Sequence, residues 1–304
     1  MGLEWVTSSL GGVLANPGLS KEVRIAAQAA NKFRQFASIK ADFGKGVADS
    51  VNFDKISNVV TSGGTLTETS TMPGTYFTIV KDTLTVTEYG ISVPFTGKLE
   101  TVSANGVKNI TIKALKNDQV KVLDKAVYTQ MALAMHKYVA SSATALNWTS
   151  NGTATLTAST NLNAFHTKEI VDKLLLLNAP PVDGENYMCI ASVKAARGLY
   201  DDLQAVWQYT KYPVNGEVGS YYRMRLVRDT YSVNNGIGTS GTAAGEAFFF
   251  GDDAVMEGVA LPEEIRYEES DFGRSKRLAW YAILGFKIIW VLDPDARIVH
   301  FTSA

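Results

Sequence analysis

The densest group of residues that could do chemistry is a run of carboxylates at residues 252–271. It holds one basic residue, Arg266, against eight acidic ones, a net charge of −7: Asp252, Asp253, Glu257, Glu263, Glu264, Glu268, Glu269 and Asp271. Carboxylates are preferred ligands of Mg²⁺ and Ca²⁺, but this spacing matches neither an EF-hand loop nor a glycosidase pair. We expect a solvated acidic loop without a metal. A metal site in a cytosolic enzyme or ligand-binding protein remains the alternative.

Other residue types that carry catalysis are few and scattered. His136, His166 and His300 lie far apart and form no metal-binding motif. Cys189 lies in an apolar stretch, where cysteine behaves as a small hydrophobe. The glycine-rich tract at 236–245 lacks the Lys-Ser/Thr ending of a phosphate-binding loop, so we interpret it as a flexible loop. We therefore expect no catalytic residue and no cofactor.

Composition excludes several further classes of function. The chain has 304 residues, enough for one large domain or two modest ones, and 46% of them are hydrophobic. A net charge of −1 gives no overall attraction to nucleic acid or to anionic membranes. The single cysteine excludes an internal disulfide and indicates folding in a reducing compartment. No apolar run approaches the ~20 residues that cross a bilayer, so we expect no membrane association.

A basic segment near the N-terminus opposes the acidic run. Residues 21–45 contain six basic and two acidic residues, and apolar residues recur at helical spacing after Ser20, a suitable helix cap. Taken alone, the segment is a solvated helix face. However, opposite charges in one chain can pair between copies in a symmetric assembly. We expect eight residues to contact neighbouring subunits: Lys21, Arg24, Lys32, Arg34, Glu263, Glu264, Glu268 and Glu269.

The middle of the chain predicts a β-rich excursion followed by a long helix. Residues 46–105 are rich in Thr, Ser and Gly and have too few large apolar residues to form a hydrophobic core of their own. They therefore either form a flexible insertion or bury their apolar surface on another subunit. A stripe from Leu123 to Tyr138 indicates a helix that begins near Asn117 or Asp118 and runs for ~25 residues. This stripe places His136 on the helix.

The second half predicts an α/β unit and a final sheet. A helix over 165–177, a strand over 187–191 and a helix capped by Ser192 follow one another, and 222–227 is a further strand. The last stretches, 278–292 and 297–301, are strongly apolar and separated by Asp293-Pro294-Asp295-Ala296. We interpret them as a β-hairpin.

Three segments resemble the major capsid proteins of the phage N4 family. Val86–Thr96 is similar to its "tEYG-x-x-V-x-x-[ST]" motif. Gly216–Val227 is similar to its "G-x-[IV]-G-x-x-x-G-x-R" strand, with Met224 where Gly is more usual. Phe249–Ala254, followed by an aromatic-rich end, also matches. The resemblance covers roughly residues 20–304.

The resemblance implies an α+β protein with the HK97-like capsid fold, divided into five parts. They are an N-terminal arm with a helix (1–45), an E-loop β-hairpin (46–105), the spine helix of the P-domain (106–141), an α/β A-domain (142–250) and the terminal sheet of the P-domain (251–304). The E-loop would then lie across a neighbouring subunit.

The resemblance also implies a non-enzymatic major capsid protein that assembles into an icosahedral phage head around the DNA genome. The partners would be other copies in hexamers and pentamers, contacted through the E-loop and arm, with a portal, a possible decoration protein and non-specific contact with packaged DNA. We expect a separate scaffolding protein, because the chain starts directly with the arm. The protein would belong to the virion and assemble in the bacterial cytoplasm. A tail or other non-capsid virion protein is the second alternative.

Overall fold

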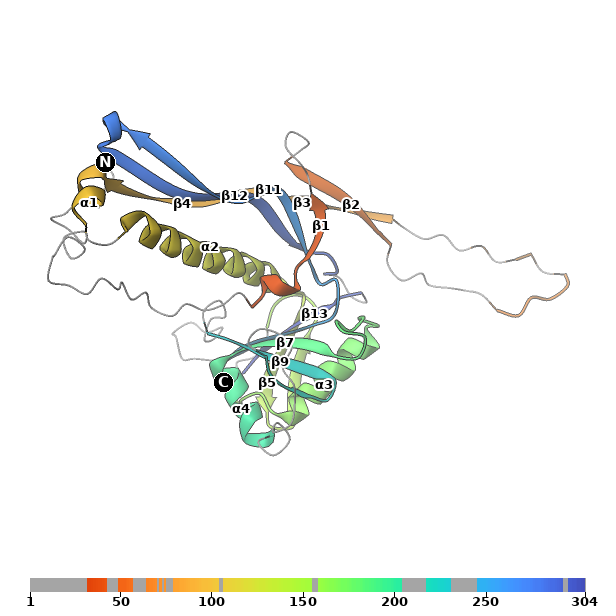
Figure 1. Ribbon diagram of the computed structural model, residues 1–304. Coiled ribbons are helices and arrows are strands. Elements are labelled where there is room, and N and C mark those ends of the chain that lie inside the picture. Colours follow the sequence, from red (N-terminus) through yellow and green to blue (C-terminus); the bar gives the residue numbers. More distant parts are fainter. Residues whose placement is uncertain are drawn as a thin grey trace.

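The computed structural model describes residues 32–42, 49–56, 64–69, 71–72, 74, 79–103, 106–154, 158–203, 217–230, 245–291 and 295–303. Most of the expected arm helix, the glycine-rich tract up to residue 244 and the Asp293-Pro294 turn lie outside these residues. The described part comprises an elongated sheet with one long helix, a compact sheet with two helices, and a two-stranded ribbon that projects away from both (Figure 1).

The elongated sheet has four strands in the order β1-β11-β12-β4. Its strands are β1 (Ser38–Asp42), β11 (Val255–Ser270), β12 (Ser275–Ile288) and β4 (Thr87–Thr96). The long helix α2 (Val107–Met131) lies along one face, below the sheet in Figure 1. Alternate residues of β12 from Leu278 to Ile288 are buried, as expected of a strand with one covered face. Leu278, Trp280, Ala282 and Leu284 share a core with Val107 and Leu115 of α2.

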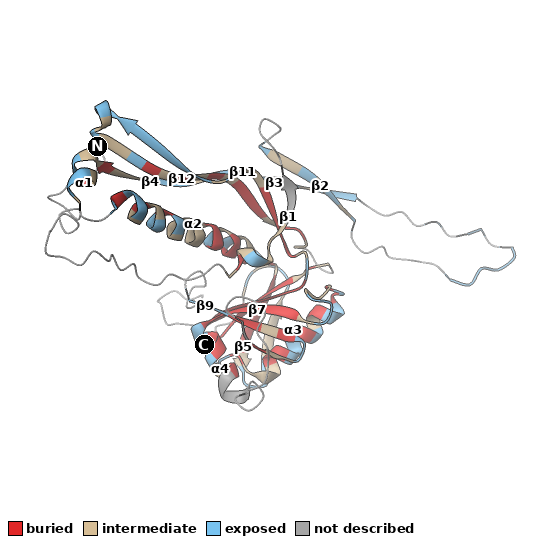
Figure 2. Cartoon of the chain, in the orientation of Figure 1, coloured by how far each residue is buried: buried red, intermediate tan, exposed pale blue. Residues whose placement is uncertain are grey.

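The compact sheet has seven strands in the order β6-β5-β13-β10-β7-β9-β8. They are β6 (Ala145–Thr149), β5 (His136–Ser142), β13 (Ile298–Thr302), β10 (Glu246–Phe250), β7 (Tyr187–Ser192), β9 (Met224–Asp229) and β8 (Glu217–Tyr221). Every residue of β13, β10 and β7 is buried (Figure 2). Strands this apolar are typical of the covered centre of a sheet.

Each face of the seven-stranded sheet has its own cover. Phe249 and Cys189 pack against α3 (Ala164–Leu176) and α4 (Val193–Leu203) on one face. Phe248 and Ile190, one residue along and therefore on the other face, pack with the C-terminal half of α2. The helix α2 thus spans both sheets.

The ribbon consists of β2 (Ser50–Ile56) and β3 (Ile79–Thr85), which pair only with each other. Three short helices complete the described chain, and the first is the 3-10 helix η2 (Arg34–Phe36), just before β1. The α-helix α1 (Gly97–Val102) follows β4, and the 3-10 helix η4 (Asp271–Gly273) joins β11 to β12.

Several predicted elements are confirmed. Residues 46–105 supply the ribbon and β4, and the strand β7 is followed by a helix whose start is capped by Ser192, because the Ala195 amide donates to Oγ of Ser192 at 3.2 Å. The helix expected at 165–177 occupies Ala164–Leu176. The long helix has the expected length of 25 residues.

The limits of that helix were predicted wrongly. It begins at Val107 rather than near Asn117, because Val107, Thr111 and Leu115 are buried and this packing outweighs the weak helix propensity of the β-branched residues there. It ends at Met131, so His136 lies in β5 and not on the helix.

The acidic run is a strand and not a loop. Residues Val255–Ser270 form β11, which is buried at its start and exposed from Glu264 onward. Its backbone pairs with β12 up to Ser270↔Ser275, so the hydrogen bonds of the ladder keep the exposed half extended although that half lacks a hydrophobic pattern. Pro262 is tolerated because β1 pairs with β11 only as far as Val259.

The predicted terminal hairpin is also wrong. The strand β12 pairs with β11 and β4, whereas β13 pairs with β10 and β5 in the other sheet. Two consecutive apolar segments separated by turn residues have the same pattern whether they pair with each other or diverge. The expected strand at 222–227 begins two residues later, because Tyr222 and Arg223 have positive φ and form the turn from β8 to β9.

Among the described residues, no helix is both long and apolar enough to cross a membrane.

Candidate functional site

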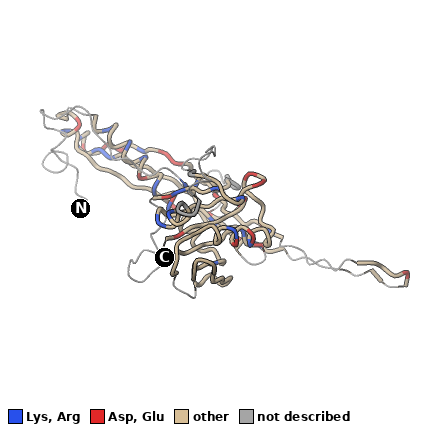
Figure 3. Tube along the Cα trace, turned by 90° about the horizontal axis from the view of Figure 1, so that it is seen from below, with Lys and Arg blue, Asp and Glu red and all other residues tan. Residues whose placement is uncertain are grey.

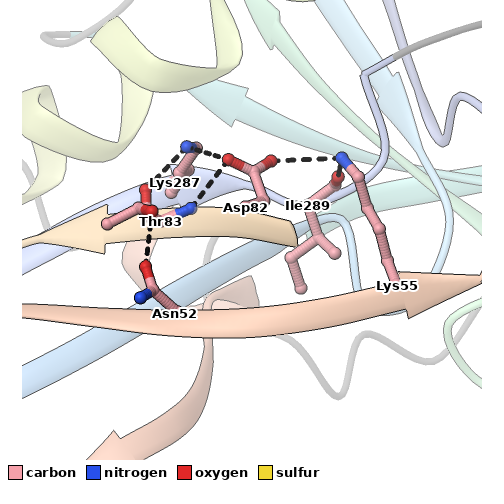
Figure 4. Close-up of polar contacts among 6 residues, drawn as sticks. All are labelled: Asn52, Lys55, Asp82, Thr83, Lys287 and Ile289. Carbon is pink, nitrogen blue, oxygen red and sulfur yellow. Dashed lines mark hydrogen bonds and ion pairs between the residues drawn. The ribbon is translucent and has the colours of Figure 1, made fainter. Parts of the chain in front are cut away.

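The ribbon is fixed to the four-stranded sheet by one polar cluster at its base. Asp82 of β3 accepts hydrogen bonds from Lys55 Nζ of β2, at 3.1 Å, and from Lys287 Nζ of β12 (Figure 4). The two ammonium groups also donate to backbone carbonyls, Lys55 to Ile289 O at 3.0 Å and Lys287 to Thr83 O at 2.6 Å. Partial burial opposes ionisation, but these hydrogen bonds prevail and lower the pKa of Asp82.

An apolar layer supports the same junction. Leu84 of β3 is fully buried against Met256 and Ile289, and Val51, Phe53 and Trp290 pack around them. Gly285 of β12 passes so close to the end of β3 that a Cβ atom there would lie 2.3 Å from Thr85 O. The base of the ribbon is therefore held by both charge and packing.

The outer end of the ribbon presents apolar side chains to solvent. Ile56 and Ile79 are direct cross-strand partners and are 49% and 51% exposed, and Val80 is 40% exposed. Leu66 and Met72, in the segment that connects the two strands, are also exposed. Isolated two-stranded ribbons are only marginally stable in water. This surface therefore lacks a cover within the described part of the chain.

The segment after the expected arm is anchored beside α2. The carboxylate Oδ1 of Asp124 accepts hydrogen bonds from the backbone amides of Lys32, Phe33 and Arg34, at 3.0, 2.7 and 3.0 Å. The buried ring of Phe33 packs edge-on against Tyr128 and Phe248. This anchor fixes the place at which the arm joins the body.

Arg34 joins this anchor to the acidic strand within one chain. Its guanidinium donates to Glu257, which is only 2% exposed, with Nη2 2.6 Å from Oε1, and Nη1 donates to Glu263. Burial of Arg34 opposes its charge, but the two carboxylates prevail and raise its pKa. The structure thus pairs Arg34 and Glu263, two of the expected subunit contacts, with each other.

The other expected contact residues have different surroundings. Lys21 and Arg24 lie outside the described residues. Glu264 pairs with Arg266 on the same strand, Glu268 lies opposite Arg277 in the β11–β12 register, and Glu269 lies 3.6 Å from Lys276. The basic residues of β12 and β11 therefore neutralise much of the acidic run inside the sheet.

The far end of the β11–β12 hairpin presents one aromatic side chain fully to solvent. Asp271, Phe272 and Gly273 all have positive φ, which is uncommon for the first two residues. The turn is braced from α1, since the Gly97 amide donates to Arg274 O at 2.9 Å and Lys276 Nζ donates to Glu100 at 2.7 Å. The hydrogen bond from Lys276 to Glu100 raises the pKa of the lysine. Phe272 is therefore held on a braced turn.

The histidines and the cysteine are all buried in the body. Cys189 is buried, which raises the pKa of its thiol and disfavours the reactive thiolate. His300 stacks on Phe248 and accepts through Nδ1 from the buried Lys137 Nζ at 2.7 Å. Burial lowers the pKa of His300, and it lowers that of Lys137 to about 8. Lys137 also donates to Ala132 O at 2.7 Å, which links the end of α2 to β5.

The described residues give no support to a metal centre. In these parts of the chain, no group of three or more His, Cys, Asp or Glu residues is arranged to hold a metal ion. The carboxylates of the acidic run point to arginine and lysine side chains instead, as in the Arg34 cluster.

Sequence reasoning missed the residues that make both anchors. Asp82 and Lys287 are 205 positions apart, and Asp124 lies 90 positions or more from the amides it binds. No local pattern marks such pairs. The one available signal was Asp124 itself, an acid at a buried position of an apolar helix face.

Comparisons with known proteins find similarity at the level of structure. No family model and no curated protein sequence matches the chain. The capsid of Ralstonia phage GP4 matches with a TM-score of 0.67 and 15% identity over 95% of both chains. The capsid of cyanophage P-SCSP1u matches with a TM-score of 0.66 and 12% identity, over 98% of this chain and 94% of that one.

A third solved structure extends this agreement. The capsid of Helicobacter pylori bacteriophage KHP30 matches with a TM-score of 0.66 and 12% identity, over 99% of this chain and 98% of that one. In each case the match spans nearly the whole of both chains. The chain therefore has the HK97-like fold of phage capsid proteins.

Proposed function

We propose that this protein is the major capsid protein of a bacteriophage, a structural protein whose copies assemble into an icosahedral shell around DNA. The observation that carries the proposal is a likeness to phage capsid structures that includes nearly the whole chain. The projecting ribbon with its exposed apolar end supports it independently, because such a surface gains stability only when another molecule covers it.

In this proposal the ribbon is the E-loop. Its base is fixed by Asp82, Lys55 and Lys287, so the ribbon keeps one direction relative to the body while its outer end packs on a neighbouring subunit. Fixing the direction in advance lowers the entropic cost of each contact. Many modest contacts of this kind then combine into a stable closed shell.

We further propose the finer assignments that the sequence motifs imply. The protein belongs to the N4-like capsid proteins, has no enzymatic activity and forms hexamers and pentamers. Its five parts follow the ranges given above, with four exceptions among the strands. The strands β1 from 1–45 and β4 from 46–105 join the P-domain sheet, and β5, mostly from 106–141, and β13 from 251–304 join the A-domain sheet. The partners are a scaffolding protein, a portal and possibly a decoration protein, and the shell assembles in the bacterial cytoplasm.

The expected charge contacts between subunits are proposed in a narrower form. Because Arg34 already binds Glu257 and Glu263 of its own chain, the proposed contacts on the arm are Lys21, Arg24 and Lys32. On the acidic strand β11, the proposed contacts are the exposed residues Glu264, Glu268 and Glu269.

Electron microscopy of the purified protein tests the proposal. We expect closed shells or capsomer-sized rings when the chain is produced alone or with its scaffolding protein. A small discrete oligomer whose melting temperature rises with Mg²⁺ or Ca²⁺ would favour a metal-binding protein instead. Tubes without closed shells would favour a tail protein.

A further inference from the structure

Few charged residues of this chain lie in its core, and two of those that do belong to one cluster. Basic and acidic residues occur along most of the described chain (Figure 3). Among the described residues, five of them are buried: Asp124, Lys137, Asp229, Glu246 and Glu257. A charge that is removed from water needs polar partners, because its burial is otherwise costly. The partners of Lys137 and Glu246 therefore indicate what this cluster does.

The cluster joins the end of α2 to three strands of the seven-stranded sheet. The hydroxyl of Tyr128 on α2 donates to Glu246 of β10 at 2.9 Å. The other carboxylate oxygen of Glu246 lies 3.7 Å from Nε2 of His300 on β13. The ammonium group of Lys137 on β5 lies 2.7 Å from Nδ1 of His300, and it also donates to Ala132 O, at the end of α2, at 2.7 Å. Tyr128, Lys137, Glu246 and His300 are each at most 7% exposed, so the cluster is shielded from water.

The strand register holds the imidazole of His300 in place. Its direct partners are Lys137 on β5 and Phe248 on β10, and its ring stacks on that of Phe248 with the centroids 4.4 Å apart. A charged lysine has only donors, so the imidazole beside it must be neutral and must offer the lone pair of Nδ1. The proton of the neutral ring is then on Nε2, toward Glu246.

The surroundings of His300 oppose a second proton on its ring. Burial and the charge of Lys137 lower the pKa of His300, although Glu246 acts in the opposite direction. Among the described residues, these two are the charged groups that act on the ring, and Phe248 faces it without a charge. Burial also lowers the pKa of Lys137 to about 8, so the lysine is still mostly charged at neutral pH.

Protonation of His300 would break the contact with Lys137. Nδ1 would become a donor that faces a group with donors only, and two positive charges would lie 2.7 Å apart inside the fold. Separation of the two side chains relieves this repulsion, and it also draws Lys137 away from Ala132 O. The link between the end of α2 and β5 is then weakened.

We propose that His300 is a proton sensor in the joint between α2 and the seven-stranded sheet, and that mild acid loosens this joint while the rest of the subunit stays folded. The inference goes beyond the proposed function and does not depend on it. Because α2 also packs against the four-stranded sheet, a loosened joint lets the two sheets move relative to each other. Histidine suits this role, since its titration lies near the mildly acidic range.

The direction of the pH effect follows from the burial of the ring. A histidine released by local opening binds a proton with its ordinary pKa of ~6.5, whereas the buried ring resists the proton. The joint is therefore complete above pH ~6.5. Opening becomes more favourable as the pH falls from there toward the lower pKa of the buried ring.

The first test follows the imidazole groups of the unassembled full-length subunit by NMR, with isotope-labelled histidine. The chain has three histidines, so single substitutions at the other two assign the signal of His300. We expect this signal to titrate with a midpoint below the ~6.5 of an exposed histidine. A midpoint at or above that value overturns the proposal, and this result needs no substitution within the cluster.

The second test measures amide hydrogen exchange of the same subunit, corrected for the intrinsic effect of pH. Protection at residues 132–139 and 298–302 should fall below pH ~6.5 by up to about tenfold for each pH unit, which is the slope for one proton. Protection in α3 should stay constant, because this helix is not part of the joint. Constant protection at the joint overturns the proposal, and so does an equal loss in α3, which would indicate global unfolding in acid.

Two variants separate titration from packing. His300→Gln retains an acceptor for Lys137 and a donor for Glu246 but cannot bind a proton in this range, so protection at the joint should no longer depend on pH. Lys137→Met removes the repelling charge and leaves Glu246 to attract the imidazolium, so the midpoint of His300 should rise. An acid response that persists in His300→Gln, or a midpoint that Lys137→Met leaves unchanged, overturns the proposal.

A matched control replaces a second buried histidine. His166 is fully buried, and its Nε2 lies 2.8 Å from Ser142 O. The variant His166→Gln should keep the wild-type response to acid at residues 132–139 and 298–302. Loss of the response in this control as well would assign it to buried histidines in general, and would overturn the specific role of His300.

Discussion

The seven-stranded sheet and the β2–β3 ribbon show two opposite ways in which this chain deals with apolar side chains. In the sheet, every residue of β7, β10 and β13 is buried within the chain itself, between α3 and α4 on one side and α2 on the other. In the ribbon, Ile56 and Ile79 remain half exposed, and only the base is fixed. The residues that stabilise the subunit and those available for assembly therefore lie in different regions. Substitutions in the sheet should lower the free energy of unfolding, and substitutions at the outer end of the ribbon should reduce assembly.

The largest effect on subunit stability is expected in the sheet. Phe249→Ala removes a fully buried ring that packs against Phe301, and it should lower the free energy of unfolding by about 3–5 kcal/mol. Urea denaturation followed by fluorescence measures this loss. Phe272→Ala makes the same substitution at a fully exposed ring and should change the free energy by less than ~0.5 kcal/mol. Similar losses in both variants would contradict the described burial.

A smaller loss is expected at the anchor of the N-terminal segment. Asp124→Ala removes the acceptor of three backbone amides and should cost about 2–3 kcal/mol. Hydrogen exchange should also become faster at residues 32–34, because their amides lose a buried partner. Asp118→Ala removes a single hydrogen bond from Trp280 and should have a smaller effect, with no change in exchange at 32–34.

The base of the ribbon should contribute less than either site and should depend on pH. Asp82→Asn should cost about 1–2 kcal/mol at neutral pH, because two lysines lose their charged acceptor. Since the folded state lowers the pKa of Asp82, this contribution is present above the unfolded value of ~3.9 and is lost as the pH falls through the folded value. Wild type and variant should therefore converge in stability at acidic pH. A difference that persists there would show that the charge is not responsible, and Asp54→Asn, at an exposed position of β2, serves as the control.

The smallest effect on the subunit, and the clearest effect on assembly, is expected at the ribbon's outer end. The double variant Ile56→Ser, Ile79→Ser should unfold within about 1 kcal/mol of the wild type, because both side chains are half exposed and contact mainly each other at the end of the ribbon. Sedimentation velocity should show far fewer shells. Leu176→Ser, at a 78% exposed residue of α3, should leave assembly unchanged. Normal shell formation by the double variant would remove the ribbon as an assembly contact.

The sequence predicted best those elements whose pattern is local. The helix α3 and the β7–α4 unit follow from apolar spacing and from the cap at Ser192, which acts only three residues away. The β-rich character of 46–105 follows from its composition. These features need no knowledge of distant partners.

The errors arose where a distant partner decides the structure. Backbone hydrogen bonds to β12 hold the exposed half of β11 in an extended conformation, although its sequence lacks the alternation of a strand. A segment whose acidic sequence is typical of a loop therefore forms a strand. The strands β12 and β13 are both apolar, and only their distant partners β4 and β10 show that they belong to different sheets. The subunit contacts expected of Arg34 and Glu263 stay predictions, because opposite charge does not reveal whether a pair forms within a chain, as here, or also between chains.

The position of β13 has a consequence for the order of folding. This strand, Ile298–Thr302, lies between β5 and β10 and joins them into one sheet, yet it comes after every other strand among the described residues. During synthesis, β5 and β6 therefore remain separated from β10, β7, β9 and β8 until β13 has left the ribosome. Contacts between positions so far apart close slowly and leave strand edges exposed in the meantime. The ribbon is made early, but a subunit can present it on a finished body only after this last strand has inserted, which delays assembly until folding is complete.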